Sequence, residues 1–164
     1  MTSTYIHTQH IQTEIEQSSS KWAVLTFRAD GTVRNGFGTY QTVWCELGRV
    51  EAALGWTLTS FRRAAKTPIR FAGFWGGDRH GATKHIHGVL ELIENSVASE
   101  TVSLINRYWA DSISRKFKHS NLDTAVHQEE LLSGKNYLRY IARYEGESFE
   151  QGDSKLILNR SYLF

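Results

Sequence analysis

The chain has 164 residues, which is the length of one domain, and its 40% hydrophobic and 22% charged residues are ordinary for a globular protein. Its 19 Lys and Arg exceed its 17 Asp and Glu by only two, and its single cysteine, Cys45, excludes an internal disulfide framework. No apolar run approaches the roughly 18 residues of a membrane span, and the polar start lacks the apolar segment of a secretory signal. We therefore expect a cytoplasmic α+β protein with no membrane partner.

The first predicted elements run from the N-terminus to residue 54. Residues 1–20 are polar and aperiodic and end in three serines, so we expect a flexible arm, in which a short helix could form near Ile11. Residues 21–28 are aromatic and β-branched and predict a strand. Residues 39–54 carry apolar side chains at helical spacing, and Gly55 is placed to end that helix.

The rest of the domain, which we expect to span residues 21–164, alternates between strand and helix patterns. The predicted strands cover residues 68–75, 85–93, 121–128 and 154–159, and the predicted helices cover 99–117 and 135–145. The first six elements follow the order β-α-β-β-α-β, which is that of a split βαβ unit. We expect a ferredoxin-like antiparallel sheet with helices on one face and the other face open.

Two histidines stand one residue apart in the predicted strand 85–93. Because strand side chains alternate, His85 and His87 share a face, about 7 Å apart along the strand. The strand residues that alternate with the histidines are apolar or small, so they suit the helix-covered face. Imidazoles so placed can bind one divalent cation, with Asp78, His80 or Glu91 as candidates for a third ligand. The alternative is a pair of surface histidines that alternate by coincidence.

Three tyrosines follow helical spacing in the predicted helix 135–145. Tyr137, Tyr140 and Tyr144 share one helix face, with Arg139 and Arg143 beside them. A phenol has a pKa near 10 and becomes a useful nucleophile when a metal polarises its target. The alternative is that the stripe packs in the core.

Together these segments resemble the HUH endonucleases of the rolling-circle replication initiator (Rep) type. Residues 24–27 (VLTF) look like the first-strand motif, residues 85–90 (HIHGVL) like the metal motif, and residues 140–144 (YIARY) like the catalytic-helix motif. The resemblance covers residues 21–146. It departs from the family in offering Asp78 and His80, with no Glu, where the third ligand is expected. No P-loop occurs, so a separate helicase would be the partner.

The resemblance implies metal-dependent nicking and rejoining of single-stranded or hairpin DNA at a replication origin. His85 and His87, with Asp78 or His80, would hold Mg²⁺ or Mn²⁺, and the catalytic helix would lie beside the open sheet face. Tyr140 would form a 5′-phosphotyrosine, and Tyr144 could attack in a second round. The expected DNA-binding residues are the cations Arg62, Arg63, Lys66, Lys84, Arg139 and Arg143. Phe74 and Trp75 could stack on bases.

Three other functions remain open at this point. One is a transposase or relaxase of the same superfamily. Another is a non-enzymatic single-stranded nucleic-acid-binding module whose histidines are incidental. The last is a metal-dependent hydrolase that uses water, in which the tyrosines are structural.

Overall fold

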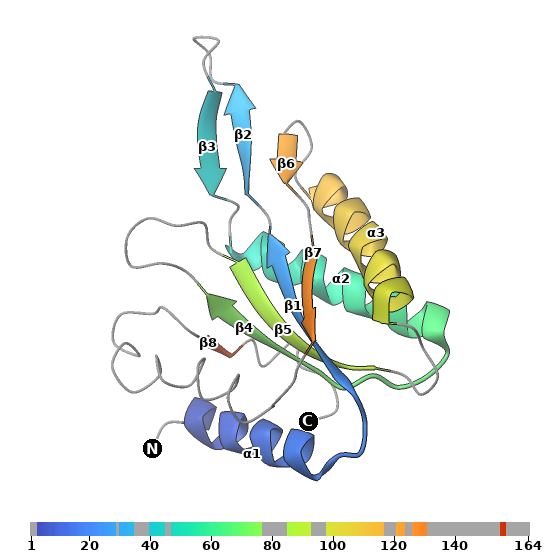
Figure 1. Cartoon of the computed structure of the whole chain (residues 1–164). Helices are drawn as coiled ribbons and strands as arrows, with labels where there is room; N and C mark the ends of the chain where they lie inside the picture. Colours follow the sequence, from blue (N-terminus) through green and yellow to red (C-terminus); the bar gives the residue numbers. More distant parts are fainter. Residues whose placement is uncertain are drawn as a thin grey trace.

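The computed structural model describes residues 3–28, 30–34, 40–44, 47–76, 85–92, 98–116, 121–123, 126–130 and 155–156. Within these residues the chain forms an α+β fold of three helices and two antiparallel sheets (Figure 1). The helices are α1 (Ser3–Gln17), α2 (Leu47–Ala65) and α3 (Ala98–Lys116).

The larger sheet has five strands in the order β7-β1-β5-β4-β8, and each strand is antiparallel to its neighbours. Its strands are β1 (Trp22–Arg28), β4 (Phe71–Gly76), β5 (His85–Glu91), β7 (Val126–Glu130) and β8 (Lys155–Leu156). The strand β5 lies between β1 and β4, although β1 and β4 are successive strands of this sheet along the chain. The sheet therefore places the histidine strand at its centre.

The smaller sheet has the order β3-β2-β6 and projects beyond one end of the larger one (Figure 1). Its strands are β2 (Asp30–Arg34), β3 (Tyr40–Trp44) and β6 (Asn121–Asp123). One residue separates β1 from β2, so this sheet extends the line of β1. Close to the junction, Trp109 Nε1 of α3 donates a hydrogen bond to the Arg28 carbonyl oxygen at 2.9 Å.

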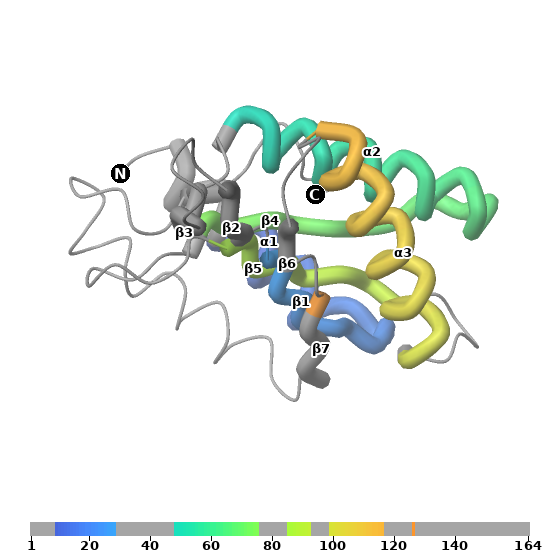
Figure 2. Tube along the Cα trace, turned by 90° about the horizontal axis from the view of Figure 1, so that it is seen from above, coloured from blue at the N-terminus to red at the C-terminus, as the bar shows by residue number. Residues whose placement is uncertain are grey.

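The main core lies between one face of the larger sheet and helices α2 and α3. Figure 2 shows α2 running along one side of strands β4 and β5. The β5 residues Ile86 and Leu90 pack there, with Phe27 of β1 and Trp109 of α3, and all four are buried. This confirms that the parity opposite the histidines faces the helices, as alternation along β5 predicts.

Helix α1 occupies the place where a flexible arm was expected, and it covers part of the sheet face that was expected to be open. Its Ile11 and Ile15, one turn apart, are 2% and 6% exposed and pack with Trp22, Phe74 and Val89 of the sheet. Because residues 1–20 are mostly polar, the sequence did not indicate that these two isoleucines would be buried. The expectation of helices on one face only is therefore wrong.

The helix predicted over residues 39–54 is also wrong in its bounds. The first part of that range is β3, whose β-branched and aromatic residues pair with β2. Helix α2 starts at Leu47 and continues through the buried Gly55, because Leu58 and Phe61 extend its apolar face. It ends at Ala65, and Lys66 takes a left-handed φ of 54°.

Strand β2 was not predicted, whereas the other described elements agree with their predictions to within a few residues. Strands β1, β4, β5 and helix α3 are confirmed, and the strand expected over 121–128 is divided between β6 and β7. The strand expected over 154–159 is described only as β8. The loop 77–84 and the helix 135–145 lie outside the described residues.

Candidate metal centre

The two histidines of β5 converge on each other at one end of the strand. His85 Nε2 lies 2.8 Å from His87 Nε2, and the ring planes are nearly perpendicular, at 88° with centroids 4.4 Å apart. Both side chains are half-buried. The sheet therefore brings two imidazole nitrogens to one point on its surface.

This spacing fits two ligands of one small cation. Two nitrogens each about 2.1 Å from an ion and at a right angle around it are about 3.0 Å apart, close to the observed separation. No group of three or more His, Cys, Asp or Glu side chains gathers within the part of the chain that the structure describes. A third protein ligand would therefore come from outside that part.

His87 is held in its neutral form by its surroundings. Burial and, in second place, the neighbouring charge of His85 together lower the pKa of His87 from 6.5 to about 4. A neutral imidazole is the form that binds a metal ion. His87 is therefore neutral near neutral pH, in the protonation state that metal ligation would require.

Thr26 of β1 touches the second nitrogen of the His87 ring. Its Oγ1 lies 3.3 Å from His87 Nδ1, and the two residues are directly opposite in the β1–β5 register. The sequence prediction used Thr26 as part of the VLTF pattern but gave it no contact. Thr26 and His87 are 61 residues apart in the sequence, so only the register between their strands shows that they face each other.

The same register extends to another histidine. Residue Thr26 pairs with His127 on β7 as well as with His87 on β5, so the three residues form one row across the sheet. His127 was not among the predicted site residues, because the sequence did not fix the register of β7.

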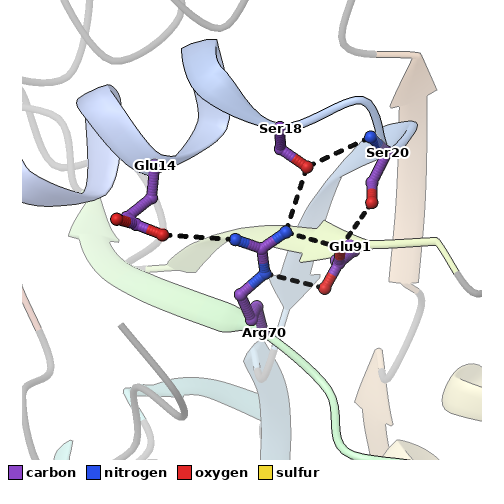
Figure 3. A network of polar contacts seen from close by, with 5 residues as sticks. All are labelled: Glu14, Ser18, Ser20, Arg70 and Glu91. Atoms are coloured by element: carbon purple, nitrogen blue, oxygen red, sulfur yellow. Dashed lines mark hydrogen bonds and ion pairs between the residues drawn. The ribbon is translucent and has the colours of Figure 1, made fainter.

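Glu91, a candidate third ligand, is engaged elsewhere. Its carboxylate accepts hydrogen bonds from Arg70 Nη2 at 2.6 Å and Arg70 Nε at 2.8 Å, and from Ser20 Oγ at 2.5 Å (Figure 3). The hydrogen bond from Arg70 holds the pKa of Glu91 below its usual range, and that from Ser20 acts in the same direction. Glu91 is thus part of a structural network and is not a ligand beside the histidines.

The network of Figure 3, which we call the Arg70 clamp, fastens α1 to the sheet. It consists of Arg70, Glu91, Glu14, Ser18 and Ser20. Arg70 also contacts Ser18 Oγ at 3.0 Å and Glu14 Oε2 at 3.4 Å, and its guanidinium lies 5.0 Å from the Trp22 ring centroid. The clamp therefore links the end of α1 to the strands beneath it.

The predicted DNA-binding cations of α2 lie away from the histidines. Arg62 and Arg63 are exposed in the last turn of α2, and the exposed Lys66 directly follows it. This helix packs on the sheet face opposite His85 and His87. Phe74 is 1% exposed, and Trp75, at 8%, donates a hydrogen bond from Nε1 to Glu51 at 2.7 Å. The expectation that Phe74 and Trp75 stack on bases is therefore wrong.

The remaining predicted site residues lie outside the described residues. They are Asp78, His80, Lys84, Arg139, Tyr140, Arg143 and Tyr144.

Comparisons with protein-family models, with curated proteins and with solved structures find no match. None of the helices in the described part of the chain has the length and apolarity needed to cross a membrane.

Proposed function

We propose that this protein is a metal-dependent endonuclease of the HUH type that nicks and rejoins single-stranded DNA through a phosphotyrosine. The observation that carries the proposal is the 2.8 Å approach of His85 Nε2 to His87 Nε2 on the central strand. The strand that carries VLTF pairs directly with the HIHGVL strand, with Thr26 opposite His87. Two of the three motifs therefore meet in space.

The topology supports the finer fold class that the proposal requires. The strands β1 and β4 flank β5 and are joined through α2, while β7 borders β1 on the far side. This strand order supports a ferredoxin-like sheet built on a split βαβ unit, with β2 and β3 inserted before α2. We therefore propose a ferredoxin-like core, to which α1 and the smaller sheet are additions.

In the proposed reaction the Tyr140 phenolate oxygen attacks the scissile phosphorus in line. A P–O bond to tyrosine forms, the bond to the 3′ oxygen breaks, and that oxygen leaves as a hydroxyl after taking a proton. A divalent ion at the histidines would stabilise charge on the phosphate oxygens. His85 and His87 would supply lone pairs to the ion, and Asp78 or His80 is the candidate for the third donor. Tyr144 is the candidate for a second attack.

The partners follow from the same reaction. The proposed substrate is single-stranded or hairpin DNA at a replication origin, with Mg²⁺ or Mn²⁺ as cofactor and a separate helicase to open the duplex. Lys84, Arg139 and Arg143 would neutralise phosphates near the site. Arg62, Arg63 and Lys66 would contact DNA only where it passes to the helix side of the sheet, given the position of α2.

A covalent-adduct assay tests the proposal. Labelled single-stranded and hairpin DNA pools are incubated with the protein and Mn²⁺ and separated on a denaturing gel. We expect a protein–DNA band that is lost with a chelator, in Tyr140→Phe and in His87→Ala.

Other results lead to different functions. Cleavage without a covalent band would indicate a hydrolase that uses water. Binding that survives the chelator, with no cleavage by any preparation, would indicate a nucleic-acid-binding module. Loss of the band in Tyr144→Phe but not in Tyr140→Phe would move the nucleophile to Tyr144. A transposase or relaxase would give the same band but a different cleavage sequence.

A further inference from the structure

We infer that Thr26 is a positioning residue for the metal site: its hydroxyl fixes the ring orientation and tautomer of His87 so that Nε2 presents its lone pair toward His85. The inference rests on the proposed metal site and adds to it a residue on another strand. It is carried by three observations: the 3.3 Å contact between Thr26 Oγ1 and His87 Nδ1, the register that pairs them, and the 2.8 Å contact between the Nε2 atoms.

The chemistry of the imidazole links the two ring nitrogens. A neutral histidine carries one N–H, and the nitrogen that binds a metal ion must be the one without it. His87 Nε2 faces His85, so ligation there requires the proton on Nδ1. The atom nearest to Nδ1 in the described contacts is the Thr26 oxygen, which can accept that hydrogen bond.

The strand geometry makes Thr26 suited to this role. Directly opposed residues of an antiparallel pair have Cβ atoms about 5 Å apart, and a β-branched side chain has few rotamers, so the hydroxyl is held in place. On the other side, His87 is paired with the buried Phe74 of β4. The ring is therefore bordered by residues of both neighbouring strands, and of these two residues Thr26 has the hydroxyl that can form a hydrogen bond while Phe74 has none.

The opposite arrangement is chemically distinct. If the Thr26 hydroxyl donates to Nδ1, the His87 proton sits on Nε2 and points at His85, and the lone pair needed for a cation is absent. The two arrangements differ in which ring nitrogen is protonated, which can be measured directly in the metal-free protein.

Two variants separate the hydroxyl from the shape of the side chain. Thr26→Val replaces the hydroxyl with a methyl group of similar volume, and Thr26→Ser keeps the hydroxyl. The ¹⁵N chemical shifts of the His87 ring are recorded for the metal-free proteins near neutral pH, and Mn²⁺ affinity is measured by calorimetry. Circular dichroism checks that each variant is folded.

We expect wild-type protein and Thr26→Ser to show a protonated Nδ1 on His87. In Thr26→Val the protonation should spread over both nitrogens, and Mn²⁺ should bind about 10–100-fold more weakly, the usual cost of losing such a partner. A wild-type ring protonated on Nε2, or a Thr26→Val protein with unchanged shifts and unchanged affinity, would overturn the role of Thr26. A wild-type protein that binds no Mn²⁺ would instead overturn the metal site itself, whatever the ring shifts show.

Discussion

Gly88 allows the histidine strand to lie against two aromatic rings. A Cβ at this position would collide with Cε2 of Phe71, would lie 2.7 Å from Phe71 Cζ, and would lie 3.1 Å from Phe27 Cε2. Those two rings meet edge to face with centroids 6.1 Å apart. The glycine of the HIHG sequence thus serves packing on the helix side, while the histidines serve the other side.

Replacing Gly88 with alanine should therefore destabilise the protein. We expect Gly88→Ala to lower the free energy of unfolding by about 1–3 kcal/mol, the cost of overpacking a filled core, as measured by urea denaturation. The control is Gly48→Ala in α2, where an added Cβ meets nothing within 4 Å. That variant should be neutral or up to about 1 kcal/mol more stable. Equal effects of the two substitutions would contradict this packing.

The lowered pKa of His87 predicts a pH-dependent stability in the metal-free protein. Burial, with the charge of His85 second, lowers this pKa from 6.5 to about 4, so between these values the unfolded chain binds a proton that the folded chain does not. Stability should therefore fall as the pH drops from 7 to 5, with a contribution from His87 of about 2 kcal/mol, and recover as the pH rises. Denaturation curves at both pH values, with a chelator present, measure it. The non-titrating variant His87→Gln should lose correspondingly less, and an equal loss would refute the assignment.

At the scale of elements, the Arg70 clamp is a polar contact between α1 and the sheet, beside the packing of Ile11 and Ile15. Arg70 makes a two-pronged contact with Glu91 and reaches Ser18 and Glu14 at the end of α1. A bidentate guanidinium–carboxylate pair is stronger than a single neutral hydrogen bond, and Glu91 would be left half-buried without it.

Removal of this guanidinium should loosen α1 before the rest of the fold. We expect Arg70→Ala to cost about 1–3 kcal/mol of stability and to raise hydrogen exchange in α1 and at the start of β1. Arg70→Lys should recover only part, because an ammonium cannot reproduce the two parallel bonds. The exposed Arg63→Ala is the matched control. If exchange in α1 were the same in all of these variants, α1 would be held by its isoleucines alone.

The sequence predicts well those elements whose pattern is local. Alternation along 85–91 was enough to divide the histidine face from the core face, and the spacing of Ile105, Trp109 and Ile113 was enough for α3. Prediction from the sequence failed where contact with a distant segment of the chain determines the structure. Ile11 and Ile15 are buried only because they pack on the surface of the sheet. Tyr40–Trp44 forms a strand because it pairs with β2.

The candidate site divides in the same way. The alternation of side chains along a strand predicts that His85 and His87 share a face, but it does not predict that their ring nitrogens lie 2.8 Å apart. That Thr26 faces His87, and that Glu91 is committed to Arg70, depends on register and on an arginine 21 residues away. Neither can be read from spacing within one strand.

At the scale of the whole molecule, the sheet separates two surfaces with different expected roles. His85 and His87 lie on one face, and α2, with the exposed cations Arg62, Arg63 and Lys66, lies on the other. Contacts with phosphates depend on salt, whereas metal ligation depends on the two histidines.

The two surfaces should therefore respond independently. Arg62→Ala/Arg63→Ala should weaken binding of single-stranded DNA and reduce the slope of log affinity against log salt by up to about 1.4, while Mn²⁺ affinity stays unchanged. Fluorescence anisotropy over a salt series measures the slope. Lys21→Ala, which removes a cation just before β1, is the control. An unchanged slope in the double variant would show that DNA does not reach α2.

Direct titration of the metal-free protein with Mn²⁺ is the sharpest test of the paired histidines. Calorimetry of the wild-type chain should give one ion per chain, and His85→Ala and His87→Ala should each weaken binding by more than about 100-fold while remaining folded by circular dichroism. Equal affinity in all three proteins, or no binding by the wild type, would contradict the metal centre and with it the proposed nuclease.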